Sequence, residues 1–307
     1  MDKRKIKTAV ITGPTGAIGT ALCLELAKNG IRVIAVCRPG SPRLAAIPQH
    51  PLIEAVECDM GTLSRLPDLI PHGADAFYHF AWAHTTGAGR NDMLAQLDNV
   101  RCTLEAVRAA HALGCQIFVG AGSQAEYGRV QGVLKPDTPC YPENGYGIAK
   151  LCAGQMSRVE AQKLGMEHIW VRVLSVYGPG DSDATMIASV IHRLLCGKKP
   201  SLTAGEQMWD YLYSGDAARA FRLIAEQGKD GKIYPLGSGH ARPLREYIEA
   251  LRDAIDPTLP LGLGEIPYAP LQVMHLEADI SALQADTGFA PFTDFADGIR
   301  ATIQSQK

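Results

Sequence analysis

The chain has 307 residues, of which 46% are hydrophobic and 20% charged, a balance typical of a globular protein with a buried core. Its 30 basic and 32 acidic side chains give a formal net charge of −2, which favours neither nucleic acid nor an anionic membrane as a partner. No stretch approaches the about 18 apolar residues of a membrane span, and the eight cysteines lack the paired spacing of a zinc site, so we expect a cytoplasmic protein without a metal.

In the first part of the chain, short β-branched runs alternate with helical patterns, as in βαβ units with a parallel sheet. The predicted strands are Thr8–Thr12, Ile31–Cys37, Ile53–Glu57, Ala76–Phe80, Gln116–Gly120 and Ile169–Leu174. The predicted helices are Ile18–Asn29, Asn91–Leu113 and Tyr146–Leu164, each followed by a glycine that suits a left-handed C-cap. The alternation predicts a doubly wound α/β fold.

After Leu174 this regularity loosens, because proline and glycine accumulate. Helical patterns remain at Ala184–Cys196, Ala217–Gln227 and Leu244–Ile255. The change of pattern predicts a second, smaller lobe in the C-terminal part of the chain.

A glycine-rich turn lies between the first predicted strand and the first helix. Gly13, Gly16 and Gly19 permit a tight turn and let the backbone approach a pyrophosphate at the positive end of the helix dipole. Since strand, turn, helix and second strand follow at the required spacing, the turn predicts a dinucleotide site. Arg38 directly follows the second strand, where arginine favours NADP over NAD, although a solvated loop arginine would give the same pattern.

Three further residues suggest the chemistry. Tyr146 and Lys150 stand four positions apart, which puts a phenol and an ammonium group on one helix face. A free tyrosine titrates near about pH 10, and a neighbouring cation lowers that pKa. Ser123 follows a predicted strand and can hydrogen-bond a reacting oxygen. Hydride transfer at a carbinol carbon needs such a proton relay, so these residues predict an NAD(P)-dependent oxidoreductase.

The chain resembles the extended short-chain dehydrogenase/reductases of the nucleotide-sugar epimerase/dehydratase family. The glycine turn resembles the family's T-G-x-x-G-x-x-G. The other similar stretches are Tyr78–Trp82 (H-L-A-A in the family), Asn99-Val100 (N-V), Ser123–Gly128 (S-x-x-V-Y-G), Val171–Gly180 (R-x-x-N-V-Y-G-P-G) and Trp209–Asp216 (R-D-F-I-Y-V-x-D).

The resemblance implies a Rossmann domain of residues 1–174 with 206–236, and a substrate-binding lobe of residues 175–205 with 237–307. Asp59 matches the family's adenine-contacting aspartate, but an N-cap for a helix after Gly61 explains it nearly as well. The predicted cofactor contacts are Gly13, Thr15, Gly16, Ile18, Gly19, Arg38, Asp59, Met60, Phe80, Ala81, Trp82, Asn99, Tyr146 and Lys150.

The substrate side departs from the family at two positions. Ser175 replaces the usual asparagine, and Trp209 replaces the arginine that grips a sugar nucleotide's diphosphate. The indole can stack on a base or sugar, or fill the hinge between the lobes. The loop after the fourth predicted strand contributes His84 and Thr85, because loops beyond the strand ends commonly bind ligands. The predicted substrate residues are His84, Thr85, Ser123, Gln124, Ser175 and Trp209.

The expected reaction interconverts a ketone and a secondary alcohol, at C4 of a nucleotide-activated sugar. A cofactor-retaining nucleotide-sugar 4-epimerase is the alternative, and a non-catalytic NADP-binding sensor is a third hypothesis. We expect that the protein is not a 4,6-dehydratase. Gln124 and Ala125 stand where dehydratases of the family carry an Asp-Glu pair, and Glu126 comes one residue late.

The expected partner is a second copy of the chain. Apolar residues recur at helical spacing within Asn91–Leu113, and the family pairs this helix and the one after Tyr146 across a dimer axis. Ordinary core packing explains the same stripe, so the homodimer follows from the resemblance and from the frequency of twofold dimers.

Overall fold

The computed structural model describes residues 3–306, and a parallel sheet of seven strands forms its centre. The strand order is β10-β6-β5-β4-β1-β2-β3, so the order of the strands reverses between β1 and β4. Ligands of such sheets bind beyond the strands' carboxyl ends at this reversal. The strands are β1 (Thr8–Thr12), β2 (Arg32–Cys37), β3 (Ile53–Glu57), β4 (Ala76–His79), β5 (Ile117–Ser123), β6 (Glu167–Val173) and β10 (Ile233–Leu236).

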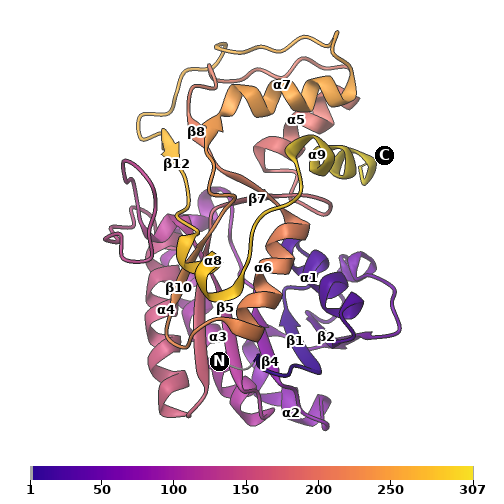
Figure 1. The fold of residues 1–307 in the computed structure, drawn as a ribbon, viewed down its shortest axis with the longest axis vertical. Helices are drawn as coiled ribbons and strands as arrows, with labels where there is room; N and C mark the ends of the chain where they lie inside the picture. The colour runs from indigo at the N-terminus through magenta and orange to yellow at the C-terminus, as the bar shows by residue number, and fades with distance from the viewer. Residues whose placement is uncertain (1–2, 307) are drawn as a thin grey trace.

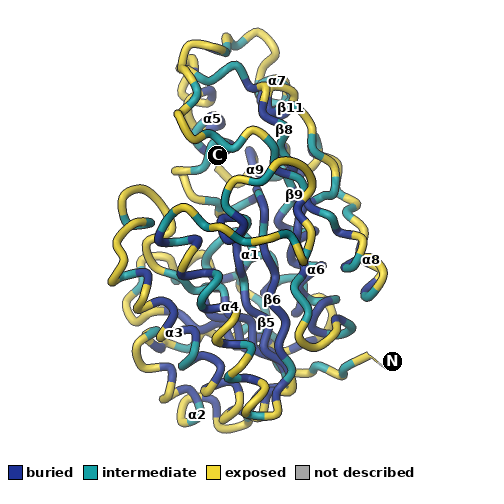
Figure 2. The backbone as a smooth tube through the Cα atoms, turned by 90° about the vertical axis from the view of Figure 1, so that its left-hand side faces the viewer, coloured by how far each residue is buried: buried dark blue, intermediate teal, exposed yellow. Residues whose placement is uncertain are grey.

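Helices cover both faces of the sheet, as the ribbon shows (Figure 1). On one face α1 (Ala17–Lys28) packs beside α6 (Ser214–Gln227), and their side chains share a core with β1, β2 and β5. On the other face lie α2 (Leu66–Leu69), α3 (Met93–Ala112) and α4 (Gly145–Lys163), with α3 packed along α4. The central strands between these layers are almost wholly buried (Figure 2). The prediction of a doubly wound parallel sheet is confirmed.

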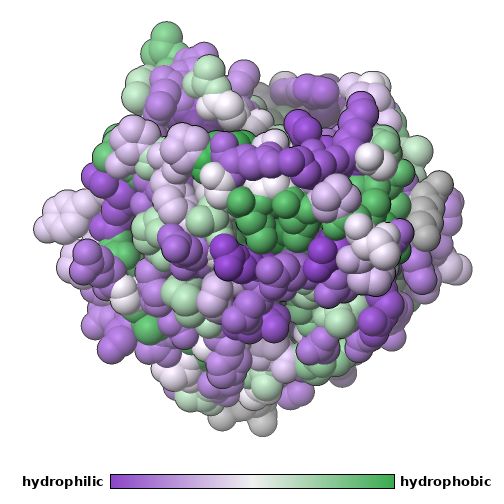
Figure 3. Space-filling view, turned by 90° about the horizontal axis from the view of Figure 1, so that it is seen from above, coloured by the Kyte–Doolittle hydropathy of each residue, from purple (hydrophilic) through white to green (hydrophobic). Residues whose placement is uncertain are grey.

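Several segments that follow β6 gather beyond the carboxyl ends of the strands (Figure 1). Three helices share an apolar core there: α5 (Met186–Leu195), α7 (Leu244–Ile255) and α9 (Phe295–Gln304). Seen from this end, the surface is mostly hydrophilic, with an apolar strip and smaller apolar patches elsewhere (Figure 3). The remaining elements are β7 (Ser175–Tyr177) paired with β9 (Tyr211–Tyr213), the small sheet of β8 (Met208–Trp209), β11 (Arg242–Pro243) and β12 (His275–Leu276), and α8 (Ser281–Thr287).

Four short 3-10 turns lie within residues 3–306. They are η1 (Leu44–Ala46), η2 (Met60–Arg65), η3 (Gly87–Asn91) and η4 (Gln124–Glu126). The glycines predicted to end the three long helices, Gly30, Gly114 and Gly165, all have left-handed φ values, of 75°, 78° and 70°. Their C-cap role is therefore confirmed.

One strand of the sheet was not predicted. β10 lies at the sheet edge beside β6, with Tyr234 opposite Val171. It is only four residues long and contains Pro235, which suits an edge strand but weakens the sequence signal. Within residues 3–306 no helix has the length and hydropathy to cross a membrane.

Candidate active site

The glycine turn between β1 and α1 is shaped by contacts that leave one side open. Gly13 has a φ of 71°, and a Cβ there would lie 2.7 Å from the Ala81 nitrogen. A Cβ on Gly19 would overlap the Gly13 carbonyl oxygen. A Cβ on Gly16 would meet no described protein atom closer than 4.0 Å. Gly13 and Gly19 are thus required by the fold, whereas Gly16 leaves free space where a pyrophosphate can approach the start of α1.

Two adjoining cavities extend from this turn, of about 690 Å³ and 300 Å³. Gly13, Gly16, Phe80 and Trp82 line both. The larger runs past the ends of β2 and β3, and we call it the adenosine end. The smaller reaches the ends of β5 and β6, and we call it the chemical end. A cleft with a glycine turn at its middle fits an extended dinucleotide.

All the residues predicted to contact the cofactor line these cavities. The adenosine end holds Thr15, Arg38, Asp59, Met60, Ala81 and Asn99, and the chemical end holds Ile18, Gly19, Tyr146 and Lys150. The Asp59 carboxylate accepts a hydrogen bond from the Gly61 nitrogen at 2.9 Å, so it also caps η2. Contact of these residues with a cofactor stays a prediction.

The predicted substrate residues divide into two groups. Thr85 and Ser123 line the chemical end, whereas His84, Gln124, Ser175 and Trp209 are not among the residues that line it. The Trp209 Nε1 donates a hydrogen bond to Ser175 Oγ at 2.8 Å, and the indole packs against two apolar clusters. The two departures from the family are thus bonded to each other, at the junction of the C-terminal segments with the sheet.

Ser123, Tyr146 and Lys150 converge at the chemical end because β5 ends where α4 begins. Asn144 caps α4 by accepting a hydrogen bond from the Gly147 nitrogen at 2.8 Å, which places Tyr146 in the first turn. Lys150 is buried one turn later. Its ammonium donates to the Ala121 carbonyl oxygen at 2.7 Å and lies 5.9 Å from the centre of the Tyr146 ring.

Burial shifts the pKa values of both titrating groups at this end. Removal from water lowers the pKa of Lys150 to about 7, and the nearby Glu126 carboxylate opposes this shift. Burial also raises the pKa of Tyr146, while the Ser123 hydroxyl and the Arg90 guanidinium act in the opposite direction. Burial thus opposes the charged form of each group.

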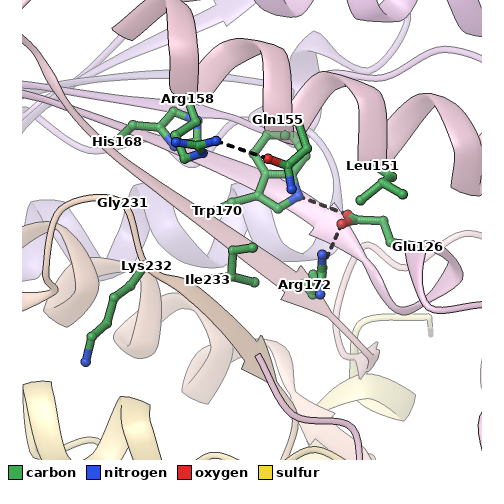
Figure 4. A pocket seen from close by; sticks show the side chains of 11 residues that line it. Glu126, Leu151, Gln155, Arg158, His168, Trp170, Arg172, Gly231, Lys232 and Ile233 are labelled. Atoms are coloured by element: carbon green, nitrogen blue, oxygen red, sulfur yellow. Dashed lines mark hydrogen bonds and ion pairs between the residues drawn. The ribbon is translucent and has the colours of Figure 1, made fainter. Parts of the chain in front are cut away.

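A buried ion pair fixes the end of β5 (Figure 4). Glu126 is fully buried, and its Oε2 accepts a hydrogen bond from Arg172 Nε at 2.7 Å. Its Oε1 accepts hydrogen bonds from Trp170 Nε1 at 2.9 Å and from the Ser123 nitrogen at 2.8 Å. The carboxylate thus ties Ser123 to β6, and it acts here as a structural group.

Three residues at or beside the chemical end were missed by the sequence analysis: Arg90, Gln96 and Asp181. Arg90 lies over the Tyr146 ring, with 4.2 Å between the guanidinium carbon and the ring centre. Gln96 binds the loop that carries Arg90. Asp181 lines the cavity, and burial raises its pKa. Asp181 directly follows the Gly178–Gly180 turn and was detectable there, whereas the η3 loop carries no periodic signal.

Comparison with known proteins identifies what the chain is similar to. The model of the NAD dependent epimerase/dehydratase family matches residues 9–237. A dTDP-glucose 4,6-dehydratase from Streptomyces griseus is 24% identical over 96% of this chain and 92% of that protein.

Two solved structures share the fold. A UDP-N-acetylglucosamine 4-epimerase from Methanobrevibacter ruminantium M1, in complex with UDP-N-acetylmuramic acid, superposes with a TM-score of 0.88 at 21% identity, over 99% of both chains. RMD from Pseudomonas aeruginosa, complexed with NADPH, has a TM-score of 0.80 at 22% identity, over 97% of this chain and 99% of that one.

These similarities correct one expectation, that the enzyme is not a dehydratase. That expectation is wrong, since curated relatives from Streptomyces, Xanthomonas and Neisseria are named dTDP-glucose 4,6-dehydratase. It rested on Gln124 and Ala125 and on Glu126 coming one residue late. An acid or base can reach a substrate from any wall of the cavity, and Asp181 shows that a carboxyl group lines it from another loop.

Proposed function

Because the chain belongs to the NAD dependent epimerase/dehydratase family, we propose that it oxidises a secondary alcohol of a nucleotide-activated sugar, most directly at C4, and can reduce the resulting ketone. The observation that supports this is the meeting of Ser123, Tyr146 and Lys150 in a cavity that shares its wall with the glycine turn. Oxidation at C4 is the first chemical step of 4-epimerases and 4,6-dehydratases alike.

In this proposal the protein's residues manage the proton. Bound nicotinamide supplies the hydride acceptor or donor. The phenolate of Tyr146 takes the proton from the substrate hydroxyl as the carbon loses its hydride, and returns it in the reverse direction. Ser123 donates a hydrogen bond to the same oxygen. Lys150, with its pKa lowered to about 7 by burial, regains its charge beside a phenolate and stabilises it.

We also propose NADP as the preferred cofactor. The exposed Arg38 lines the adenosine end together with Ser41 and Arg43. A guanidinium suits a 2′-phosphate, whereas the acidic residue typical of NAD sites is absent at position 38. In the same proposal, residues 1–174 with 206–236 bind the cofactor, and residues 175–205 with 237–307 bind the sugar nucleotide.

A homodimer through α3 and α4 is the proposed assembly. Leu94, Leu97 and Ile148 are 79%, 61% and 51% exposed, and Met156 and Val159 extend the same exposed apolar surface along α4. Such a surface on two adjacent helices is typical of an interface. Light scattering on the purified protein should give the mass of two chains, and the mass of one chain would contradict the assembly.

The test of function uses the purified chain with bound or added cofactor. The protein is incubated separately with four sugar nucleotides: dTDP-glucose, UDP-glucose, UDP-glucuronic acid and UDP-N-acetylglucosamine. The products are identified by mass spectrometry and NMR. We expect turnover of at least one, seen as inversion at C4, loss of water, or accumulation of reduced cofactor. These outcomes separate an epimerase, a dehydratase and a simple dehydrogenase. No turnover of any sugar nucleotide would refute the proposal.

A further inference from the structure

Two buried amide side chains of α3, those of Gln96 and Asn99, hold the loop that follows β4. The side chain of Gln96 on α3 is 1% exposed. Its Nε2 donates hydrogen bonds to the carbonyl oxygens of His84 at 2.9 Å and Gly89 at 3.0 Å, and its Oε1 accepts one from Trp82 Nε1 at 2.9 Å. Both ends of the loop, and the indole beside the catalytic pair, are therefore fixed to α3.

The same loop sits directly on the start of the catalytic helix. Asn91 Oδ1 accepts a hydrogen bond from the Gly145 nitrogen at 2.9 Å, at the first residue of α4. A Cβ on Gly145 would lie 2.9 Å from the Arg90 carbonyl oxygen, so only glycine allows this close approach. The backbone of Arg90 is thus placed next to Tyr146 by contacts independent of its own side chain.

The Arg90 side chain then covers the Tyr146 ring. Its Nη1 donates a hydrogen bond to the Thr85 carbonyl oxygen at 3.0 Å, which orients the guanidinium above the ring at 4.2 Å from its centre. Trp82 meets the ring edge-on, with 6.1 Å between ring centres. Arg90 is not among the residues that line the chemical end. It contacts the catalytic phenol from outside the cavity.

The charges that face Tyr146 are few. Arg90 approaches from η3, Lys150 from the next turn of α4, and the Glu126 carboxylate from η4, with the uncharged Ser123 hydroxyl between. Lys150 is held by the Ala121 carbonyl oxygen and lies 3.7 Å from the centre of the Trp82 ring. Arg90 is therefore the cation nearest to the ring, with 4.2 Å against 5.9 Å for Lys150.

We propose that Arg90 is a positioning residue for the catalytic tyrosine, holding the phenol ring from its outer face and favouring the phenolate through its positive charge. A cation over an aromatic face attracts the ring electrostatically, and the attraction grows when the ring carries negative charge. The proposal rests on the proposed function, in which Tyr146 moves the proton.

The experiment measures ionisation of Tyr146 without any substrate. Carbon-13 labelled tyrosine is incorporated, the Tyr146 signal is assigned with Tyr146→Phe, and the signal is titrated in the oxidised-cofactor complex of the wild type, Arg90→Gln and Arg90→Lys. Arg90→Gln should raise the pKa of Tyr146 by about one unit, since a cation is lost. Arg90→Lys keeps the positive charge but loses the planar stacking group. Its Tyr146 pKa should therefore lie between those of the wild type and Arg90→Gln. Arg300→Gln, at an exposed position of α9, is the matched control, and its Tyr146 signal should titrate as in the wild type.

Turnover against pH gives the second readout. In the oxidation direction Tyr146 must be deprotonated, so Arg90→Gln should lose about tenfold in kcat at neutral pH and recover at alkaline pH. An unchanged titration of Tyr146, or a fall in kcat by the same factor at every pH, would overturn the proposal. A shifted titration in a protein that turns over no sugar nucleotide supports the role of Arg90 and refutes the proposed function alone.

Discussion

The two ends of the dinucleotide cleft are built in opposite ways. At the chemical end, Lys150 and Glu126 are buried, and each is held by fixed hydrogen bonds. At the adenosine end, Arg38 is exposed on a loop, and Asp59 is held by a single local cap. A buried group is costly to leave without its partner, whereas an exposed group is screened by water. Substitutions should therefore affect turnover and stability at the first end, and cofactor choice alone at the second.

The largest effect should come from the phenol at the chemical end. Tyr146→Phe should lower turnover by roughly 10²- to 10⁴-fold, because only the proton relay is lost. Cofactor affinity, measured by titration calorimetry, should stay near that of the wild type. The matched control is Tyr141→Phe, whose ring is 78% exposed. A Tyr146→Phe variant that keeps more than about a tenth of the wild-type rate would exclude Tyr146 as the proton carrier.

The next effect concerns stability at the same end. Glu126→Ala leaves Arg172 buried without its partner and should lower the free energy of unfolding by about 3–5 kcal/mol, measured by denaturant titration. Glu143→Ala is the control, because it breaks an exposed pair with Arg129 that water screens. An equal loss of unfolding free energy in the two variants would show that the buried pair does not fix the chemical end.

The smallest effect should appear at the adenosine end. Arg38→Asp should shift the affinity ratio from NADP toward NAD by roughly 10- to 100-fold, since a carboxylate repels the 2′-phosphate and accepts the 2′-hydroxyl. The unfolding midpoint should not move, because Arg38 is exposed. Wild-type protein that binds NAD at least as tightly as NADP would refute the role given to Arg38.

The sequence by itself determined what depends on periodicity and short spacing. The glycine turn lies between β1 and α1 as predicted, and β1, β3 and α7 have their predicted bounds. Tyr146 and Lys150 share a helix face because their spacing of four residues matches the helical turn. Such features are local, so a few neighbouring residues suffice to specify them.

Only the tertiary structure decided how irregular segments support these elements. The ion pair between Glu126 and Arg172 joins residues 46 positions apart. The bond between Trp209 and Ser175 spans 34 positions. Arg90 reaches Tyr146 through a loop without any repeating pattern. These partners lie near one another because the sheet places the ends of β4, β5 and β6 at one edge, and no spacing along the chain encodes that proximity.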